Sequence, residues 1–488
     1  MHFDLLVLGS GPAGQKAAIQ ASKLGKRAAV VERMATLGGV SIHMGTIPSK
    51  TLREAVVYLT GYQQRTFYGR GYSVVSEITM ADLMLRAEHV IRHEIDLTGR
   101  QLLRNQVEVL SGEASFVDPH TVAVAQAGGP RSLVTADRIL IATGSEAARD
   151  AHIPFDGKRV LTSDDLLRLP EVPASLAIIG AGIIGTEYAG IFATLGIGVT
   201  LIDRRPQLLP FVDGEIGEIL ARQLVDNGLV LHLAEDVEHV DVQRPEYVEV
   251  RLTSGKVVHA GAVLYSIGRV GATATLNLAA AGLQADERGR IPVDECFRTA
   301  VPHIYAAGDV IGSPALAATS MEQGRLASCH AFGVPENTAT VPLPYAIYSV
   351  PEIAMLGPTT RELEDAGVPC VAGRAAYKEI ARGQMLGDET GFLKMLFHTE
   401  TGRLLGIHAL GAHASELIHI GQAVMAFGGG LDYFIDTVFN YPTLAECYKT
   451  AALDAANVLR RAGKYTTIEP FVPAPPVLGL NQARRRST

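Results

Sequence analysis

The sequence is poor in cysteine, with four in 488 residues. Cys296, Cys329, Cys370 and Cys447 are widely scattered, which excludes a disulfide framework and a CxxC metal site. The sequence also lacks an excess of positive charge, because its formal net charge is −8. A nucleic acid is therefore not expected as the main partner, since proteins that bind phosphate backbones usually carry a basic face.

Segments that would direct the chain to a membrane are scarce as well. The N-terminal stretch MHFDLLVLGSGPAG has no basic region and only a short apolar run, so no signal peptide is expected. Residues 175–202 carry one charge, Glu187, and are long enough for a membrane span. Their glycines follow a strand–turn–helix–strand pattern instead, and buried parallel strands form continuous apolar runs. We therefore expect no membrane partner and a cytoplasmic location.

The most informative feature present is a glycine-rich pattern, G-x-G-x-x-G, that occurs twice. The first copy comprises strand Phe3–Leu8, glycines Gly9, Gly11 and Gly14, a helix to about Leu24, strand Ala28–Val31 and the acid Glu32. The second comprises strand Leu176–Ile179, glycines Gly180, Gly182 and Gly185, a helix to about Leu195, strand Val199–Ile202 and the acid Asp203. The acid follows the middle glycine at the same separation in both copies, from 11 to 32 and from 182 to 203.

Each position of this pattern has a physical purpose. The first glycine permits a tight turn, the second lets a pyrophosphate approach the backbone, and the third lets the helix pack closely on the strand. The helix N-terminus offers free N–H groups and a partial positive charge to the phosphates. The acid accepts hydrogen bonds from a ribose. Two copies in the same context predict two nucleotide sites.

The two sites differ just after the acid. The second continues Asp203-Arg204-Arg205, whereas in the first Glu32 is followed by a single arginine, Arg33. A carboxylate suits a free ribose 2′-hydroxyl, and an arginine suits a 2′-phosphate. The combination predicts a second site that accepts both NAD and NADP. The alternative is that one or both arginines point into solvent.

Further motifs follow in the order Arg138–Ser145 (RILIATGS), Val263–Arg269 (VLYSIGR), Ile304–Val310 (IYAAGDV), Pro344–Gly357 and Gly406–Gly421. With these, nearly the whole chain resembles the FAD-dependent pyridine nucleotide–disulfide oxidoreductase family. The resemblance implies an α/β fold with two Rossmann-like domains, binding FAD and NAD(P), and a C-terminal α+β dimerisation domain. It also implies a homodimer or higher homo-oligomer.

The resemblance suggests boundaries for these domains. Residues 1–150 are expected to form the first part of the FAD-binding domain, 151–270 the NAD(P)-binding domain and 271–340 the second part of the FAD-binding domain. Residues 341–464 are expected to form the dimerisation domain. Residues 465–488 are rich in proline and are expected to form a flexible tail or to pack along the dimer surface.

The resemblance also assigns residues to the two cofactor sites, with NAD and NADP as substrates and no metal. The FAD site is expected to comprise Gly9, Gly11, Gly14, Glu32, Arg33, Lys50, Thr143, Gly144, Gly308 and Asp309, the last of which holds the ribityl chain. The NAD(P) site is expected to comprise Gly180, Gly182, Gly185, Glu187, Asp203, Arg204, Arg205 and Gly268.

The chain departs from the family at its catalytic signature. Disulfide reductases carry two cysteines ahead of Ile-Pro-Ser-Lys, where this chain has the hydroxyls of Ser41 and Thr46. Without a thiolate there is no nucleophile for a disulfide. The reductases' histidine base is replaced by Tyr441, which cannot serve as a base near neutral pH. Glu446, which follows it in the same segment, is expected to be structural.

These departures favour hydride transfer without thiols. The segments Gly-Thr-Ile-Pro-Ser-Lys and Phe-Asn-Tyr-Pro-Thr resemble the family's transhydrogenases, which implies a hydride moved between NADPH and NAD through the flavin in a ping-pong cycle. The alternative is a reductase that passes electrons from NAD(P)H to a quinone or another small acceptor. A third reading is a flavoprotein that signals its nucleotide state to a partner.

Lys50 is the first candidate for a catalytic residue. By resemblance it lies beside flavin N5, where an ammonium stabilises negative charge on the reduced ring. Its family partner corresponds to Glu187, which would explain the one charge in an apolar stretch. The alternative is a glutamate on a helix surface. Tyr188 is either a gate over the nicotinamide pocket or a core residue.

The histidines are not expected to bind metal. His89 and His93 have helical i,i+4 spacing but lack the glutamate of HExxH, so a solvated helix is expected. His398, His408, His413 and His419 are expected to serve packing or the dimer interface.

Overall fold

In the computed structural model, which describes residues 1–463 except 70, 127 and 336–341, each glycine-rich pattern lies in a parallel sheet. The predicted tail at 465–488 lies outside the described residues. The described chain forms two units. Residues 1–210, 221–335 and 347–350 make the first unit. Residues 211–220, 342–346 and 351–463 make the second.

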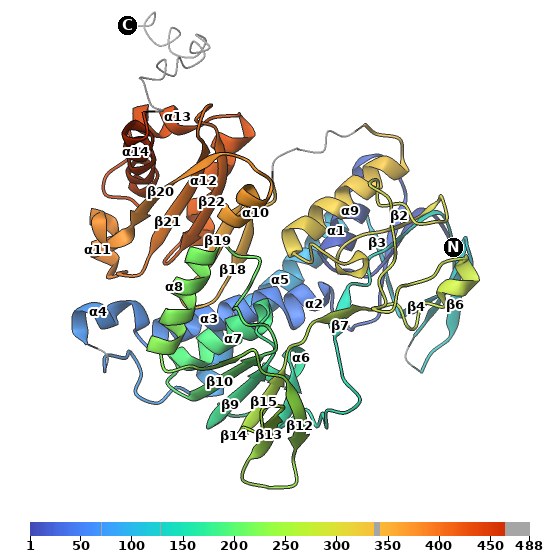
Figure 1. Ribbon diagram of the computed structural model, residues 1–488. Helices are drawn as coiled ribbons and strands as arrows, with labels where there is room; N and C mark the ends of the chain where they lie inside the picture. The colour runs from blue at the N-terminus through green and yellow to red at the C-terminus, as the bar shows by residue number, and fades with distance from the viewer. Residues whose placement is uncertain (70, 127, 336–341, 464–488) are drawn as a thin grey trace, which may run out of the picture. The chain divides into compact units, whose positions relative to one another are not determined.

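The first unit contains two sheets with parallel strands, one around each pattern (Figure 1), and four strands follow the same order in both. The sheet around the first pattern has the order β3-β2-β1-β6, with β17 paired to the end of β6. Its strands are β1 His2–Leu8, β2 Ala28–Glu32, β3 Glu108–Ser111, β6 Arg131–Ile141 and β17 Ile304–Ala306. The sheet around the second pattern has the order β11-β10-β9-β15-β8. Its strands are β8 Val160–Thr162, β9 Ser175–Ile179, β10 Gly198–Asp203, β11 Val230–Leu233 and β15 Ala262–Tyr265.

An antiparallel meander follows the third parallel strand in each copy. The first meander comprises β4 Glu113–Asp118, β5 Thr121–Ala125 and the start of β6. The second comprises β12 Val237–Asp241, β13 Val248–Leu252 and β14 Val257–Ala260. A two-stranded ribbon of β7 Ser145–Ala147 and β16 Arg269–Gly271 links the copies.

The first unit contains helices of very different length. They are α1 Pro12–Lys23, α2 Gly39–His43, α3 Thr46–Leu59, η1 Tyr62–Gln64, α4 Arg65–Tyr68, α5 Met80–Arg104, α6 Ser163–Leu166, α7 Ile183–Thr194, η2 Leu278–Ala281, η3 Asp309–Ile311 and α9 Ala317–Ala331, while α8 Gly214–Asp226 belongs partly to each unit. On β1, Leu6 and Leu8 face one core and Leu5 and Val7 face another, beneath α1 and α9. This burial on both faces is the reason that parallel strands read as continuous apolar runs.

The predicted elements of both patterns are present, and their ends differ from the predicted ones by about one residue. The apolar stretch 175–202 forms β9, α7 and β10. Among the residues that the structure describes, no helix is long and apolar enough to cross a membrane. The four domain boundaries remain a prediction.

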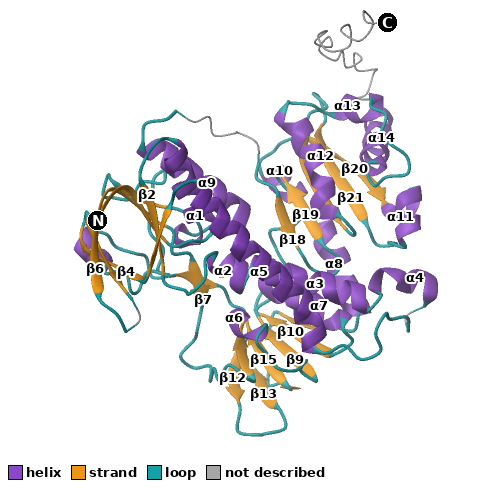
Figure 2. Cartoon of the chain, turned by 180° about the vertical axis from the view of Figure 1, so that it is seen from behind, coloured by secondary structure: helices purple, strands orange, loops and turns teal. Residues whose placement is uncertain are grey.

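The second unit is built on the sheet β18-β19-β22-β21-β20 (Figure 2). Its strands are β18 Tyr345–Ile347, whose last residue is grouped with the first unit, β19 Ile353–Leu356, β20 Cys370–Ala376, β21 Phe392–His398 and β22 Leu404–Leu410. Its helices are α10 Thr360–Asp365, η4 Tyr377–Glu379, α11 Ala381–Leu386, α12 Ala414–Ala426, α13 Leu431–Asp436 and α14 Glu446–Arg461.

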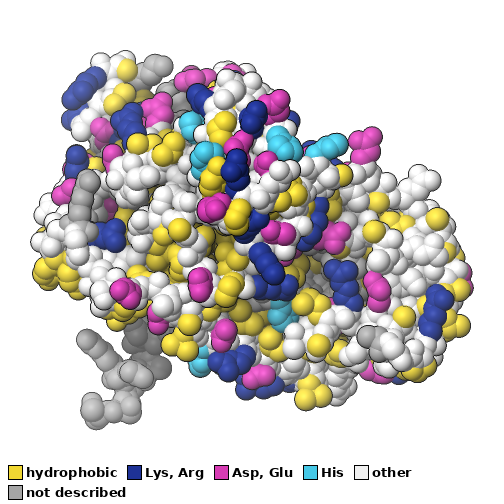
Figure 3. Space-filling model, turned by 90° about the horizontal axis from the view of Figure 1, so that it is seen from below, with side chains coloured by type: hydrophobic (Ala, Val, Ile, Leu, Met, Phe, Trp, Pro, Cys, Tyr) yellow, Lys and Arg dark blue, Asp and Glu magenta, His cyan; other side chains and the backbone are white. Residues whose placement is uncertain are grey.

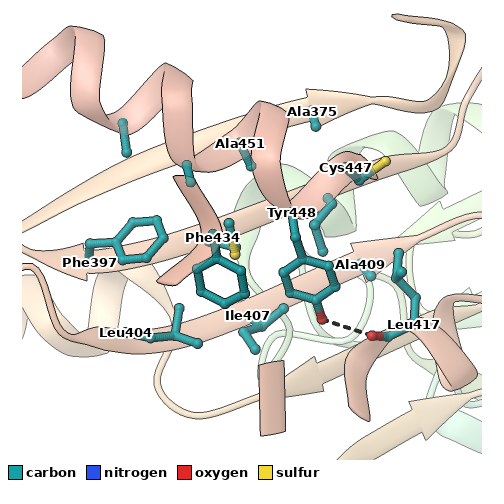
Figure 4. Packing of buried hydrophobic residues seen from close by; sticks show 14 of the residues in the cluster. Ala375, Phe397, Leu404, Ile407, Ala409, Leu417, Phe434, Cys447, Tyr448 and Ala451 are labelled. Atoms are coloured by element: carbon teal, nitrogen blue, oxygen red, sulfur yellow. Dashed lines mark hydrogen bonds between the residues drawn. The ribbon is translucent and has the colours of Figure 1, made fainter. Parts of the chain in front are cut away.

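The core of the second unit lies between this sheet and helices α12 and α14. Tyr448 on α14 stacks on Phe434 at 5.2 Å between ring centroids (Figure 4). Its hydroxyl donates a 2.8 Å hydrogen bond to the carbonyl of Leu417 on α12, drawn as a dashed line in Figure 4. The buried phenol is thereby satisfied and ties the two helices together.

A buried ion pair joins Lys394 on β21 to Asp213, which immediately precedes α8. The Lys394 side chain is 4% exposed, and its Nζ lies 2.8 Å from Asp213 Oδ1 and 3.1 Å from Glu215 Oε2. Asp213 also accepts hydrogen bonds from the N–H and hydroxyl of Thr360. Burial alone would raise the pKa of Asp213, but the hydrogen bonds from Lys394 and Thr360 lower it to about 2. The pair attaches residues 211–220 to the sheet of the second unit.

Charges of both signs share the surface. On the face drawn in Figure 3, lysine and arginine side chains alternate with aspartate and glutamate and with apolar side chains. This intermixing accords with a net charge of −8 spread over the chain.

Replacing Lys394 by methionine should lower the free energy of unfolding of the second unit by ~3–5 kcal/mol, because it leaves the Asp213 carboxylate buried without its cation. The measurement is the urea midpoint by circular dichroism, with the exposed Lys378→Met as matched control. In the wild type the contribution of Asp213 is present above about pH 4 and lost as the pH falls towards about 2. Equal midpoints for the two variants would contradict the ion pair's importance.

Candidate functional site

The first and third glycines of each pattern are required by the protein itself. Gly9 and Gly180 have φ of +107° and +103°, in the region that favours glycine. A Cβ on Gly14 would lie 1.9 Å from the carbonyl oxygen of Gly9, and one on Gly185 would lie 1.9 Å from that of Gly180. No side chain fits at such distances, so each helix starts directly against the end of its strand.

The middle glycines are different. Gly11 and Gly182 have φ of −65° and −73°, which any residue adopts, and a Cβ there would meet nothing within 4 Å. They are the N-caps of α1 and α7, and neither helix has a side-chain cap. Open space in front of uncapped N–H groups fits a ligand phosphate.

The acid of the first pattern is held by backbone and hydroxyl donors. Glu32 is buried, and its Oε2 accepts hydrogen bonds from the N–H and hydroxyl of Ser10 at 3.0 and 2.6 Å. Its Oε1 accepts the N–H of Met34 at 2.8 Å. These bonds fix the carboxylate at the end of β2, beside the phosphate turn. The predicted neighbour Arg33 is exposed.

The acid of the second pattern accepts hydrogen bonds from the equivalent backbone N–H groups and also pairs with an arginine side chain. Asp203 accepts the N–H groups of Ala181 and Arg205 at 2.6 and 2.8 Å. The Arg205 guanidinium also binds both carboxylate oxygens, at 2.8 and 2.7 Å. Burial would raise the pKa of Asp203, but the hydrogen bonds from Arg205 lower it below the ordinary value. Arg204 is exposed, so the two arginines occupy different positions.

The structure brings Lys50 on α3 and Glu187 on α7 together. Lys50 Nζ lies 2.6 Å from Glu187 Oε2, and the Glu187 side chain is 6% exposed. The surface alternative for Glu187 is therefore wrong. The backbone N–H of Tyr348 donates to Glu187 Oε1 at 2.8 Å. Tyr188 is 3% exposed, with its ring 6.4 Å from that of Phe192, which fits the core alternative.

A chain of polar contacts joins the turn that follows β6 to the turn that follows β15. Ser145 donates its hydroxyl to Asp309 Oδ2 at 2.8 Å and accepts Arg269 Nε at 2.8 Å. Arg269 also pairs with Asp164 at 3.1 Å. Next to Ser145, the Thr143 hydroxyl is buried and has no hydrogen-bond partner among the described residues. An orphaned hydroxyl beside the first phosphate turn fits a polar cofactor that would satisfy it.

The remaining predicted glycines lie at turns of the first unit. Gly144 and Gly268 have φ of +73° and +104°, and a Cβ on either would meet nothing within 4 Å. Gly308 has φ of +81° and packs on Ala13 of α1. The turns at Gly144 and Gly268 therefore leave open space after β6 and β15, whereas glycine at position 308 permits close packing against α1.

The residues in place of the family's cysteines and histidine lie on defined elements. Ser41 is on the short helix α2 and Thr46 begins α3, the helix that carries Lys50. In the second unit, Tyr441 is 69% exposed. Glu446 begins α14, and its Oε2 is buried without a hydrogen-bond partner among the described residues.

The histidines do not form a cluster. His89 and His93 are exposed on α5, as the sequence predicts. His408 is fully buried and bonds the carbonyl of Pro358 through Nε2, whereas His413 and His419 are exposed. Within the described part of the chain, no group of three or more histidine, cysteine or acidic side chains could hold a metal ion.

Sequence reasoning missed four residues that shape the site: Ser10, Ser145, Arg269 and Tyr348. Ser145 and Arg269 are the last residues of the motifs Arg138–Ser145 and Val263–Arg269. Ser10 is the variable residue between the first two glycines of the first pattern. These three residues therefore lie in motifs that the sequence analysis had already recognised. Tyr348 also lies inside a recognised motif, Pro344–Gly357, but that motif gave no indication of its contacts with Lys50 and Glu187, which lie far away in the sequence.

Two family models match the chain. The pyridine nucleotide-disulphide oxidoreductase model matches residues 3–324, and the dimerisation-domain model of the same family matches residues 343–452. Among curated relatives, the soluble pyridine nucleotide transhydrogenase of Mycobacterium bovis is 51% identical over 465 residues, 95% of this chain and 99% of the relative. The protein of the same name from Colwellia psychrerythraea is 42% identical, over 94% and 98% of the two chains.

Solved structures share the architecture. LpdA from Mycobacterium tuberculosis matches with a TM-score of 0.85 at 26% identity, over 92% of this chain and 98% of that one. The HOCl-induced flavoprotein disulfide reductase RclA from Escherichia coli matches with a TM-score of 0.82 at 27% identity, over 92% and 99%. The duplicated nucleotide lobes, the second sheet unit and these matches agree, and the chain belongs to the pyridine nucleotide-disulphide oxidoreductase family, including its dimerisation domain.

Proposed function

We propose that this protein is a flavin-dependent transhydrogenase that moves a hydride between NADPH and NAD. The observation that carries the proposal is the ribose end of the second lobe, where Asp203 is bound by Arg205 and Arg204 stands exposed beside it. One site with a carboxylate and two guanidinium groups suits both a 2′-hydroxyl and a 2′-phosphate. The names of relatives at 42–51% identity over nearly their full length support this activity.

The first lobe is the proposed FAD site. The open space at Gly11 would take the pyrophosphate, Glu32 would accept the adenosine ribose hydroxyls, and Asp309 would hold the ribityl chain. The orphaned Thr143 hydroxyl would gain a partner there. The other residues proposed for this site are Gly9, Gly14, Arg33, Lys50, Gly144 and Gly308.

The second lobe is the proposed NAD(P) site. The space at Gly182 would take the nicotinamide nucleotide's pyrophosphate at the start of α7. Gly180, Gly185 and Gly268 would shape the turns around it. Because this lobe is one site, the two nucleotides would occupy it in turn, which gives a ping-pong order.

The proposed catalytic residues are Lys50 and Glu187. Bound FAD supplies the chemistry of accepting a hydride from one nicotinamide and returning it to the other. Lys50 would place a positive charge beside the reacting ring, where charge stabilisation is most effective in a site that excludes water. Glu187, nearly inaccessible and 2.6 Å from Lys50 Nζ, would orient that ammonium.

Arg204 and Arg205 have separate proposed roles. Arg205 neutralises Asp203, which lowers the repulsion that a buried carboxylate would exert on a 2′-phosphate. The Arg204 side chain is exposed, so its guanidinium would be available to contact the phosphate. With Arg205 turned from Asp203 towards the 2′-phosphate, Asp203 would retain its two backbone donors.

Thiol chemistry is not part of the proposal, because hydroxyls stand at Ser41 and Thr46. The alternative of a quinone reductase is not favoured by the relatives' names. We further propose that the enzyme is a homodimer that works in the cytoplasm. The dimerisation-domain match supports the first point, and four cysteines that form no disulfide within the described chain suit a reducing compartment.

The direct test is to mix the purified protein with NADPH and thio-NAD and follow thio-NADH absorbance. We expect steady formation of thio-NADH, with initial rates that give parallel lines in double-reciprocal plots, as a ping-pong order requires. Fast reduction of a quinone without any thio-NADH would overturn the proposal.

Replacing the middle glycines should separate binding from folding. In Gly11→Ala the fold should persist, because the new Cβ meets no protein atom, but FAD affinity should fall more than about tenfold as the methyl group enters the pyrophosphate space. Gly182→Ala should stay yellow and lose affinity for both nicotinamide nucleotides instead. Flavin content, nucleotide titration and melting temperature distinguish these outcomes, and each variant is the control for the other. The assignment fails if the two variants lose the same ligand.

Replacing Arg204 or Arg205 by alanine should raise the KM for NADPH relative to that for NADH by about tenfold or more, because each removes a charge-assisted hydrogen bond to the 2′-phosphate. Arg244→Ala, which removes an exposed arginine from the same lobe, is the matched control. A KM ratio equal to that of the control in both variants would show that the ribose assignment is wrong.

A further inference from the structure

Four residues from late in the chain pack between helices α3 and α7 of the first unit. These residues, Ile347–Val350, belong to the first unit, although the residues that flank them belong to the second. Ser349 is buried, and its carbonyl accepts Arg53 Nε on α3 at 2.9 Å. On the other side, a Cβ on Gly190 of α7 would lie 3.0 Å from the N–H nitrogen of Val350. The segment is therefore anchored to the two helices that carry Lys50 and Glu187.

Tyr348, inside this segment, contacts both members of the ion pair. Its backbone N–H donates to Glu187 Oε1 at 2.8 Å, while Lys50 binds Oε2 at 2.6 Å. Both oxygens of a buried carboxylate are thus occupied, which fixes its rotation about the terminal bond. A Glu187 fixed in this way presents one defined oxygen to the lysine.

The ring of Tyr348 also faces the lysine. Its centroid lies 5.1 Å from Lys50 Nζ, within the range of a cation–π interaction. The Lys50 side chain is 27% exposed, so the interaction operates in a partly desolvated setting. The ammonium is therefore held by a carboxylate and by an aromatic face, which restricts a side chain that otherwise has four rotatable bonds.

We infer that Tyr348 is a positioning residue for the proposed reaction, which holds the Lys50 ammonium in place through its ring and the Glu187 carboxylate through its N–H. The inference rests on the proposed function of the Lys50–Glu187 pair. Tyr348 lies outside the two glycine patterns and outside the segment that carries Lys50, so a further part of the chain would help to position the catalytic pair.

The test compares Tyr348→Leu with Tyr348→Phe in the FAD-loaded enzyme. Leucine removes the aromatic face and keeps the N–H, whereas phenylalanine keeps both. We expect Tyr348→Leu to slow flavin bleaching by NADPH and by NADH equally, by about 3- to 30-fold, because both nucleotides use the same ammonium. Its flavin midpoint potential should become more negative, since a cation held near the ring favours the reduced form. Tyr348→Phe should stay within about twofold of wild type.

The matched control is Tyr345→Leu, the same substitution at the nearby tyrosine on β18. The Tyr345 ring packs on Phe211 at 5.8 Å between centroids. A potential shift of the same size in this control would mean that loss of either tyrosine ring disturbs the site, and the inference would be overturned. Melting temperatures of all variants report whether the fold has changed.

A second arm removes the lysine. In a Lys50→Met background, Tyr348→Leu should have no further effect on the bleaching rate or the potential, because the ring acts through the ammonium. An additive effect in that background would overturn the inference. Bleaching by NADPH is measured without a second nucleotide, so an absent transfer to thio-NAD contradicts the proposed function and leaves the Tyr348 result interpretable.

Discussion

Both nucleotide lobes depend on one steric constraint, the direct contact of a helix start with the end of the preceding strand. The third glycine of each pattern has no room for even a methyl group, since its Cβ would lie 1.9 Å from a carbonyl oxygen. The constraint aims the uncapped helix N-terminus at the space in front of Gly11 or Gly182. It also places the N–H of the residue after the first glycine, Ser10 or Ala181, against the acid at the end of the second strand. One backbone arrangement thus serves two ligands.

Side chains at the strand ends then make the two sites different. Glu32 is held by neutral donors, whereas Asp203 is bound by a guanidinium. Glu187 and Asp213, also buried, are each paired with a lysine. All four carboxylates obey the same rule, that a buried charge is stable only when donors or an opposite charge replace the water it has lost. In this chain the rule is met at the sites of proposed chemistry and in the core of the second unit alike.

The fold of this family is compatible with either thiol exchange or direct hydride transfer, and the side chains near Lys50 decide between them. Here hydroxyls at Ser41 and Thr46 replace a possible thiolate, and the ion pair of Lys50 and Glu187 remains. A hydroxyl is far too weak an acid to serve as the nucleophile at neutral pH without a base. The retained features are those that a nucleotide–flavin reaction needs. The contact of Tyr348 with both members of the pair extends this machinery to the segment Ile347–Val350, which belongs to the first unit.

The sequence by itself determined the two nucleotide lobes, the position of their acids and the family, because these rest on local requirements. A glycine needed for positive φ or close approach can be recognised from its neighbours, and Gly9, Gly14, Gly180 and Gly185 all meet that need. Resemblance to the family also paired Lys50 with Glu187, 137 residues apart. Only the tertiary structure decided that Arg205 binds Asp203 while Arg204 stays exposed, that Lys394 joins Asp213, and that Tyr348 faces Lys50. These contacts depend on which side chains folding brings together across many residues, and no local pattern encodes that.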